Sequence, residues 1–456
     1  MPFYLQYLSL VEYGYWVVIR SISSWLFFID PGFASLARAR SAKHFGEKQF
    51  RAIWNDTVLA IYSTFAISVI VGLGAFGVYF LLPQLLGVSE SDLVQRIGIA
   101  FIILALGGII MLFAYVLAAI NDGLQQGAQT GACLIIANGA SIIGSVAMLI
   151  AGWGINSLAL AYVIMPVIYL ILVAAFLRRN LNLLGIKFQG RIEGFREFMG
   201  DSVTNFRGRI SSVLAKSMDR WLVARFLGPE VVVAYDFLKR LPETGFGIMT
   251  QMPHAFASSV SSLAGEDQKR LGLWGLRITG LQVMGCISAA AVALSINREF
   301  ISLWVGEGFY TQGWNNLWIV CWLLFASLLS CVSVLSVAAG HIKEASNTLF
   351  IYSVGLIPFL IVGITWGGLH GFISAGAVWA ALCYGLRFRR GLVKSFCFTS
   401  VQNKKLTITT GATGIVGVVV VLSAQSFPAD TWPILIGKTL LICITLTVLN
   451  LSLIHI

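Results

Sequence analysis

Long apolar segments, most of them about twenty residues or more, follow one another along almost the whole chain. About twenty consecutive apolar residues carry an α-helix across the hydrocarbon core of a bilayer, whereas a membrane-spanning β-strand needs only about ten. Runs of this length therefore predict helices. The composition agrees, because 57% of the residues are hydrophobic and 11% are charged, against about 25% charged in a soluble domain. We predict an all-α integral membrane protein.

Thirteen complete helices are expected, and residues 1–10 resemble the end of one more, so the first helix is expected to be incomplete. The thirteen lie near residues 14–37, 53–82, 97–121, 129–153, 155–178, 203–227, 231–257, 271–297, 315–340, 346–368, 370–388, 406–424 and 432–453.

Positively charged residues gather in alternate loops. The rich loops are 38–51, 178–200, 258–272 and 387–405, and the poor ones are 83–93, 153–156 and 228–230. Lys and Arg are enriched in the cytoplasmic loops of membrane proteins, so the rich loops and the C-terminus are predicted to be cytoplasmic. The same bias explains the net charge of +11 without a nucleic-acid partner.

The two halves of the sequence resemble each other at a nearly constant offset. EYGYW at 12–16 overlies VAYDF at 233–237, PGFAS at 31–35 resembles PHAFAS at 253–258, and Arg20 falls on Arg240. This predicts a repeat of six helices whose two copies have the same orientation in the membrane. Transporters build a cavity between two such bundles.

The predicted domains follow from the repeat. They are an N-terminal bundle with an incomplete first helix (1–178), a cytoplasmic linker (179–200), a C-terminal bundle (201–390) and two additional transmembrane helices (391–456).

Charges within the predicted helices are the main functional signal. In the helix at 203–227, Arg209, Lys216 and Arg220 fall within about 40° of one another at 100° per residue. Charges at bilayer depth usually face a partner or a watery cavity. We predict a cationic cavity for an anionic substrate, in which arginine suits phosphate because its fork binds two oxygens. The predicted substrate-binding residues are Arg20, Arg209, Lys216, Arg220, Lys239 and Arg240.

The alternative is that these cations serve only in structural ion pairs. Asp236 and Arg240 are four residues apart on one helix, and Asp219 and Glu243 can neutralise two further cations. Asp219 is also a candidate ion-coupling residue. Asp30 is another, although it precedes Pro31 and could equally cap a helix break.

Enzymatic chemistry has little support in the sequence. The histidines and cysteines show no metal-ligand or redox spacing, and no Walker motif is present. We therefore predict no catalytic residue, no metal and no cofactor.

Two stretches carry a resemblance to a known family. YLSLVEYGYWVVIRSISSWLFFIDPGFAS at 7–35 and DRWLVARFLGPEVVVAYDFLKR at 219–240 resemble the polysaccharide-biosynthesis transporters, which include O-antigen flippases. The superfamily also contains the multidrug and toxin extruders (MATE proteins) and the lipid II flippases. The resemblance implies a MATE-like fold and a flippase that moves an undecaprenyl-pyrophosphate-linked oligosaccharide to the outer leaflet of the bacterial inner membrane by alternating access.

The same resemblance implies membrane lipid, a polysaccharide polymerase and chain-length machinery as partners. Three other functions stay open at this point. A non-transporting membrane scaffold would leave the cost of the intramembrane charges unexplained. A drug or cation extruder of the same superfamily would favour an acidic cavity, and the excess charge here is basic. A membrane polymerase or glycosyltransferase usually has long external loops, and none is evident here.

Overall fold

The computed structural model describes residues 2–26, 32–87, 91–185, 195, 218–266, 268–311, 313–396 and 400–454. Within these ranges the chain is helical and contains no strand. It divides into two compact units, Phe3–Arg225 and Phe226–Ile456. Residues 218–225 therefore pack with the first unit. The domain boundaries expected at 178, 200 and 390 stay predictions.

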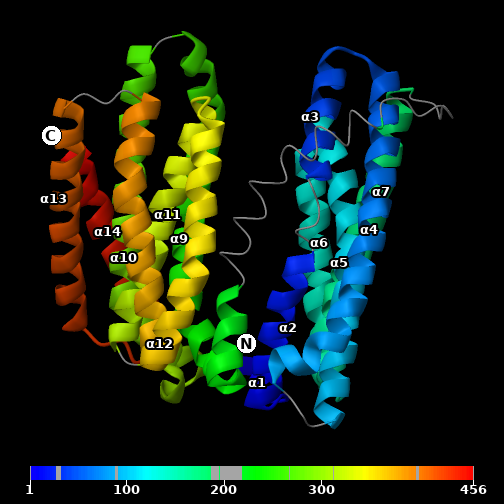
Figure 1. Cartoon of the computed structure of the whole chain (residues 1–456), viewed down its shortest axis with the longest axis horizontal. Helices are drawn as coiled ribbons and strands as arrows, with labels where there is room; N and C mark the ends of the chain where they lie inside the picture. Colours follow the sequence, from blue (N-terminus) through cyan, green and yellow to red (C-terminus); the bar gives the residue numbers. More distant parts are fainter. Residues whose placement is uncertain are drawn as a thin grey trace. The chain divides into compact units, whose positions relative to one another are not determined.

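The first unit is built around one long central helix, α5 (Ser91–Gly123), which packs against α2, α3, α4 and α7. The remaining helices (Figure 1) are α1 (Pro2–Leu5), α2 (Leu10–Leu26), α3 (Phe33–Gly46), α4 (Phe50–Leu86), α6 (Gly127–Ile150), α7 (Ile155–Leu183) and a helical segment at 218–227. Phe33, Ile53, Leu59 and Ile120 are buried together where α3, α4 and α5 meet. This apolar cluster holds the three helices together.

The second unit contains α9 (Pro229–Glu266), α10 (Gln268–Val305), α11 (Gly313–Ala338), α12 (Ile342–Phe396), α13 (Ser400–Gln425) and α14 (Trp432–Ile454), with a short 3₁₀ turn, η2, at Glu307–Phe309. α12 consists of two helical arms that meet at a kink, because Gly367 and Gly368 have non-helical φ and ψ angles. The arms lie close beside the kink, since a Cβ on Gly363 would be 2.3 Å from the carbonyl oxygen of Gly371.

The predicted repeat reappears in how each unit is packed. α5 packs against α3, α4 and α7, and α11 packs against α9, α10 and α12. In chain order, α4 of the first unit corresponds to α10 of the second. The helices α6 and α7 correspond to the two arms of α12. α13 and α14 follow the second copy and pack on α10. The predicted fold class of two similar six-helix bundles with two added helices is confirmed.

At Gly32 the structure differs from the prediction of one continuous helix. One helix was predicted over 14–37, but α2 and α3 are separate elements and Gly32, with a φ of 96°, caps the start of α3. A left-handed residue cannot continue a right-handed helix, and Pro31 beside it lacks the backbone donor that continuation needs. The prediction followed the apolar composition of residues 14–37 and gave too little weight to Pro31 and Gly32.

Where the structure describes them, the expected loops rich in positive charge are also largely helical. α3 covers most of 38–51, α7 continues to Leu183 and α12 continues to Phe396. Lys and Arg have good helix propensity, so these helices extend past their apolar spans. Hydropathy therefore located the spans but underestimated the length of the helices.

Nine helices in the described ranges are long and apolar enough to cross a membrane. α9 is 38 residues long but is not among them, because charges interrupt its first half and its second half is only weakly apolar. Side chains such as Leu73, Phe76 and Ile143 are more than half exposed on α4 and α6. Large apolar surfaces of this kind mark contact with lipid or with another protein, and here they belong to a multi-pass membrane protein.

α14 is fixed to the second unit by a buried ion pair. The ammonium Nζ of Lys438 donates to both carboxylate oxygens of Glu299 on α10, at 2.6 and 2.9 Å. Ala291, Val420 and Leu435 pack around the same helices. The helix outside the repeat is therefore attached through both charge and apolar contact.

Candidate functional site

The structure places five of the eight candidate residues. Arg20 lies on α2, Asp219 and Arg220 lie on the segment 218–227, and Lys239 and Arg240 lie on α9. Asp30, Arg209 and Lys216 lie outside the described residues, so the cationic stripe predicted along 203–227 stays a prediction.

Arg20 and Arg220 line the same cavity within the first unit. It has a volume of about 720 Å³ and is bounded by α2, α5, α6, α7 and the segment 218–227. This is the size of a typical small-molecule pocket. Among the described residues that line it, no carboxylate is present. Two of the predicted cations therefore contribute their guanidinium groups to one cavity.

Arg20 is oriented by a tyrosine from α7. Its guanidinium Nη1 donates to the hydroxyl of Tyr162 at 3.4 Å. The ring of Tyr162 packs edge-on against Trp16 of α2, with 5.6 Å between ring centroids. α7 approaches α5 closely here, since a Cβ on Gly107 would lie 2.1 Å from the carbonyl oxygen of Tyr162. The absence of a side chain at Gly107 thus sets the position of Tyr162 and, through it, of Arg20.

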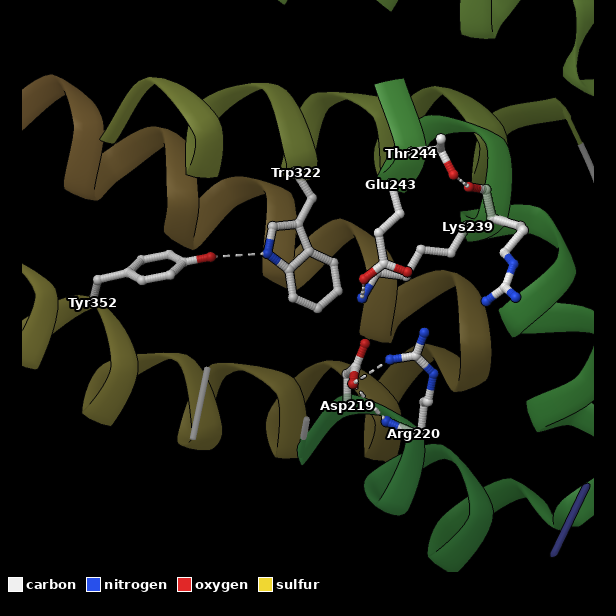
Figure 2. A network of polar contacts seen from close by, with 8 residues as sticks. Asp219, Arg220, Lys239, Glu243, Thr244, Trp322 and Tyr352 are labelled. Carbon is white, nitrogen blue, oxygen red and sulfur yellow. Dashed lines mark hydrogen bonds and ion pairs between the residues drawn. The ribbon is translucent and has the colours of Figure 1, made fainter. Parts of the chain in front are cut away.

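Arg220 is paired with its neighbour Asp219, and Figure 2 shows the pair. The backbone N–H of Arg220 donates to Oδ1 of Asp219 at 2.9 Å, and the guanidinium Nη1 lies 3.8 Å from the same oxygen. Asp219 is 2% exposed and Arg220 is 8% exposed. The indole Nε1 of Trp221 donates to the carbonyl of Leu85 at 3.3 Å and ties the segment to α4. Asp219 therefore has a structural role, and its ion-coupling role stays a prediction.

Lys239 of the second unit is buried beside aromatic rings. Its ammonium lies 3.7 Å from a carboxylate oxygen of Glu243, and 5.8 and 5.9 Å from the ring centroids of Tyr235 and Trp322. The indole of Trp322 donates to the hydroxyl of Tyr352 at 3.1 Å, as Figure 2 shows. Rings near a cation stabilise its charge. The ion pair expected for Glu243 is present, and the substrate-binding role of Lys239 stays a prediction.

A proline in α9 is compensated by a buried asparagine. Pro242 has no N–H, so it cannot donate to the carbonyl of Leu238 four residues earlier. The side-chain amide of Asn297 on α10 donates to that carbonyl at 2.9 Å and to Oδ1 of Asn316 on α11 at 2.7 Å. This contact fixes the backbone of α9 immediately before Lys239 and Arg240.

The residues that orient the cations were not found from the sequence. Tyr162, Trp322 and Asn297 come from helices other than those of the cations they support. Each residue type is common in membrane helices, and no spacing links it to its partner. The proline at 242 was the one visible signal, because a proline inside a helix requires another donor for the freed carbonyl.

The second unit has a different kind of cavity. A groove of about 530 Å³ lies between α9, α10 and α14. Leu241, Ile248, Met284, Val292 and Leu446 are among the residues that line it. It is predominantly apolar, and none of its described lining residues carries a charge.

These two helical units define a multi-pass membrane protein with a MATE-like fold. The structure is similar to an inward-facing multidrug resistance MATE family transporter of the MOP superfamily, with a TM-score of 0.69 and 15% identity over 87% of this chain and 96% of that one. It is similar to the lipid II flippase MurJ in an inward closed conformation, with a TM-score of 0.66 and 13% identity over 97% and 95%. At such identities the likeness establishes the fold.

The sequence profile of the family described as "Polysaccharide biosynthesis protein" matches residues 1–252, which is more than half of the 456 residues. The chain belongs to this family, and the resemblance inferred from 7–35 and 219–240 is confirmed. A comparison with curated protein sequences finds no match.

Proposed function

We propose that this protein is a flippase that moves an undecaprenyl-pyrophosphate-linked oligosaccharide from the cytoplasmic to the outer leaflet of the bacterial inner membrane. The family supports a role in polysaccharide biosynthesis, and the fold is one that transporters and flippases use. The product would feed the synthesis of a surface polysaccharide such as O-antigen.

The observation that carries this proposal is the cavity of the first unit with Arg20 and Arg220 in its wall. A pyrophosphate presents several anionic oxygens, and two guanidinium groups can bind them in pairs. The apolar surroundings raise the strength of this attraction above its value in water. Because no carboxylate lies among the described lining residues, the cavity favours an anion over the cationic drugs that an extruder would carry.

The second unit supplies further candidate contacts. Lys239 and Arg240 occupy on α9 the place that Arg20 occupies on α2, since Arg20 is the eleventh and Arg240 the twelfth residue of its helix. We propose Lys239 and Arg240, together with Arg209 and Lys216, as further substrate-binding residues. Asp30 and Asp219 are kept as candidate ion-coupling residues.

Replacing either arginine of the cavity should slow transport. The full chain would be reconstituted in liposomes with a fluorescent undecaprenyl-pyrophosphate-linked oligosaccharide, and exposure of the sugar would be followed with a quencher that does not cross the membrane. Arg20→Ala and Arg220→Ala should each reduce the rate about tenfold or more, because a hydrogen bond to a charged group contributes roughly 1.5–3 kcal/mol. Thermal unfolding of Arg220→Ala must also be measured, because the change removes the guanidinium group that lies beside the buried carboxylate of Asp219.

Arg178→Ala is the matched control, because Arg178 is exposed at the end of α7. It should leave the rate unchanged. If Arg20→Ala and Arg220→Ala fold and still transport at the original rate, the site is misassigned. If the liposomes expel cationic dyes and never expose the sugar, the extruder function is correct instead.

The orientation in the membrane gives a separate test. Arg38 and Arg40 lie on α3, and Arg178 and Arg179 lie near the end of α7. The enrichment of such residues in cytoplasmic segments supports a cytoplasmic location for this part of α3 and for the end of α7, and we propose the same side for the C-terminus. A reporter that is active only in the cytoplasm should be active when fused after residue 456, and one that is active only in the periplasm should be inactive there. The opposite pattern would overturn the proposed sidedness.

A further inference from the structure

The cavity of the first unit holds more hydrogen-bonding groups than a phosphate needs. Besides the two arginines, its walls include Ser21, Ser23 and Ser24 of α2, Asn138 and Ser141 of α6, and the hydroxyl-bearing rings of Tyr115 and Tyr162. These groups both donate and accept. An anion uses donors only, so this mixture is suited to a ligand that also carries hydroxyl groups.

Backbone acceptors also reach the cavity wall on α7. Pro166 cannot donate to the carbonyl of Tyr162 four residues earlier, and both residues line the cavity together with Gly107. The carbonyl of the preceding residue, Ala161, already accepts from the hydroxyl of Ser141 at 2.7 Å. The carbonyl of Tyr162 is therefore the acceptor on this part of α7 that lacks its helical donor.

Ser23 is the most informative residue of this wall. Its side-chain oxygen is buried and has no hydrogen-bond partner among the described residues, although the residue lines the cavity. A buried hydroxyl without a partner reduces stability by roughly 1–3 kcal/mol. Such a cost is offset when a ligand supplies the partner.

We infer that this cavity binds a sugar ring of the substrate beside its pyrophosphate, with Ser23 and Asn138 bonded to sugar hydroxyls and Arg20 bonded to the phosphate. The inference rests on the proposed function. The volume of about 720 Å³ lies within the range of pockets that enclose a small organic ligand. The ring of Tyr162, held edge-on by Trp16, offers a flat apolar face for the C–H groups of a pyranose. The first unit would thus recognise the sugar as well as the charge.

Binding to the purified full chain in detergent tests this inference. The probes are lipid-linked oligosaccharide extracted from the source cells, undecaprenyl pyrophosphate without sugar, and the free oligosaccharide. Ser23→Ala should weaken binding of the lipid-linked oligosaccharide about tenfold, as expected for one lost hydrogen bond, and should leave binding of undecaprenyl pyrophosphate unchanged. Without ligand, the variant should be as stable as the original protein or more stable. Asn138→Leu should show the same selectivity between the two lipids.

Ser63→Ala is the matched control. Ser63 lies on α4, and its buried hydroxyl also lacks a partner among the described residues, but it is not part of the cavity wall. This variant should bind all probes as the original protein does. The inference is overturned if Ser23→Ala binds both lipids as tightly as the original protein does, or if its binding of both lipids is weakened. It is also overturned if the free oligosaccharide binds the original protein as tightly as the lipid-linked form. If the original protein binds neither lipid, the proposed function itself fails.

Discussion

Replacing Asn297 with Leu should destabilise the second unit and slow transport together. The side chain is fully buried, and its amide donates both to the carbonyl of Leu238 and to Asn316. Leucine has a similar volume but cannot donate, so two buried acceptors lose their partner. Each such loss costs roughly 1–3 kcal/mol. We expect a clear fall in the midpoint of thermal unfolding in detergent and at least a tenfold slower exposure of lipid-linked sugar in liposomes.

A second substitution separates this mechanism from general damage to packing. Pro242→Ala restores an N–H that can donate to the carbonyl of Leu238 along α9. In the Asn297→Leu background it should recover part of the lost thermal stability. Transport should stay slow, because the contact between residue 297 on α10 and Asn316 on α11 stays lost. If Pro242→Ala recovers no stability, the carbonyl of Leu238 is not what Asn297 protects. Asn182→Leu, at an exposed position of α7, should change neither property.

Replacing Lys438 with Met should have a comparably large effect on stability. Lys438 is 7% exposed and Glu299 is 19% exposed at their side chains, so the change leaves a carboxylate largely buried without its cation. Removing one partner of a buried ion pair destabilises by about 3–5 kcal/mol, and the residual exposure of Glu299 places the expected value near the lower end. The midpoint of thermal unfolding in detergent would measure it.

The double variant Lys438→Met with Glu299→Leu should recover most of this loss, because two apolar side chains of similar size need no desolvation of charge. Lys404→Met, at an exposed position of α13, is the control and should leave stability unchanged. A double variant no more stable than Lys438→Met would show that the ion pair is not the source of the effect.

Charge and hydropathy in the sequence predicted a large part of this molecule. Arg20 and Arg220 stand out because charges are costly in apolar helices, and the structure places both at one cavity. Their partners could not be predicted in the same way. Tyr162 reaches Arg20 from a helix 142 positions away in the sequence, and this contact depends on how closely α5 and α7 approach at Gly107. Helix packing at this level has no local sequence signature.

Backbone geometry accounts for the errors in the predicted helices. The positive φ of Gly32 separates α2 from α3, where the apolar pattern favoured one continuous helix. At Gly367 and Gly368, by contrast, the kink of α12 falls where the prediction placed a boundary between two helices. Both breaks occur at glycine, yet most glycines in this chain lie inside helices. Sequence alone therefore did not separate the glycines that end a helix from those that allow close packing.

The two cavities differ in the chemistry of the residues that line them. The first unit has a chamber with arginines, serines and tyrosines, whereas the groove of the second unit is lined by Leu, Ile, Met and Val. The groove is not the counterpart of the chamber in the repeat, because α14 forms one of its walls and lies outside the repeat. A chimaera made from two first halves would therefore lack this groove. The added C-terminal helices contribute an apolar binding surface that duplication of the bundle alone does not provide.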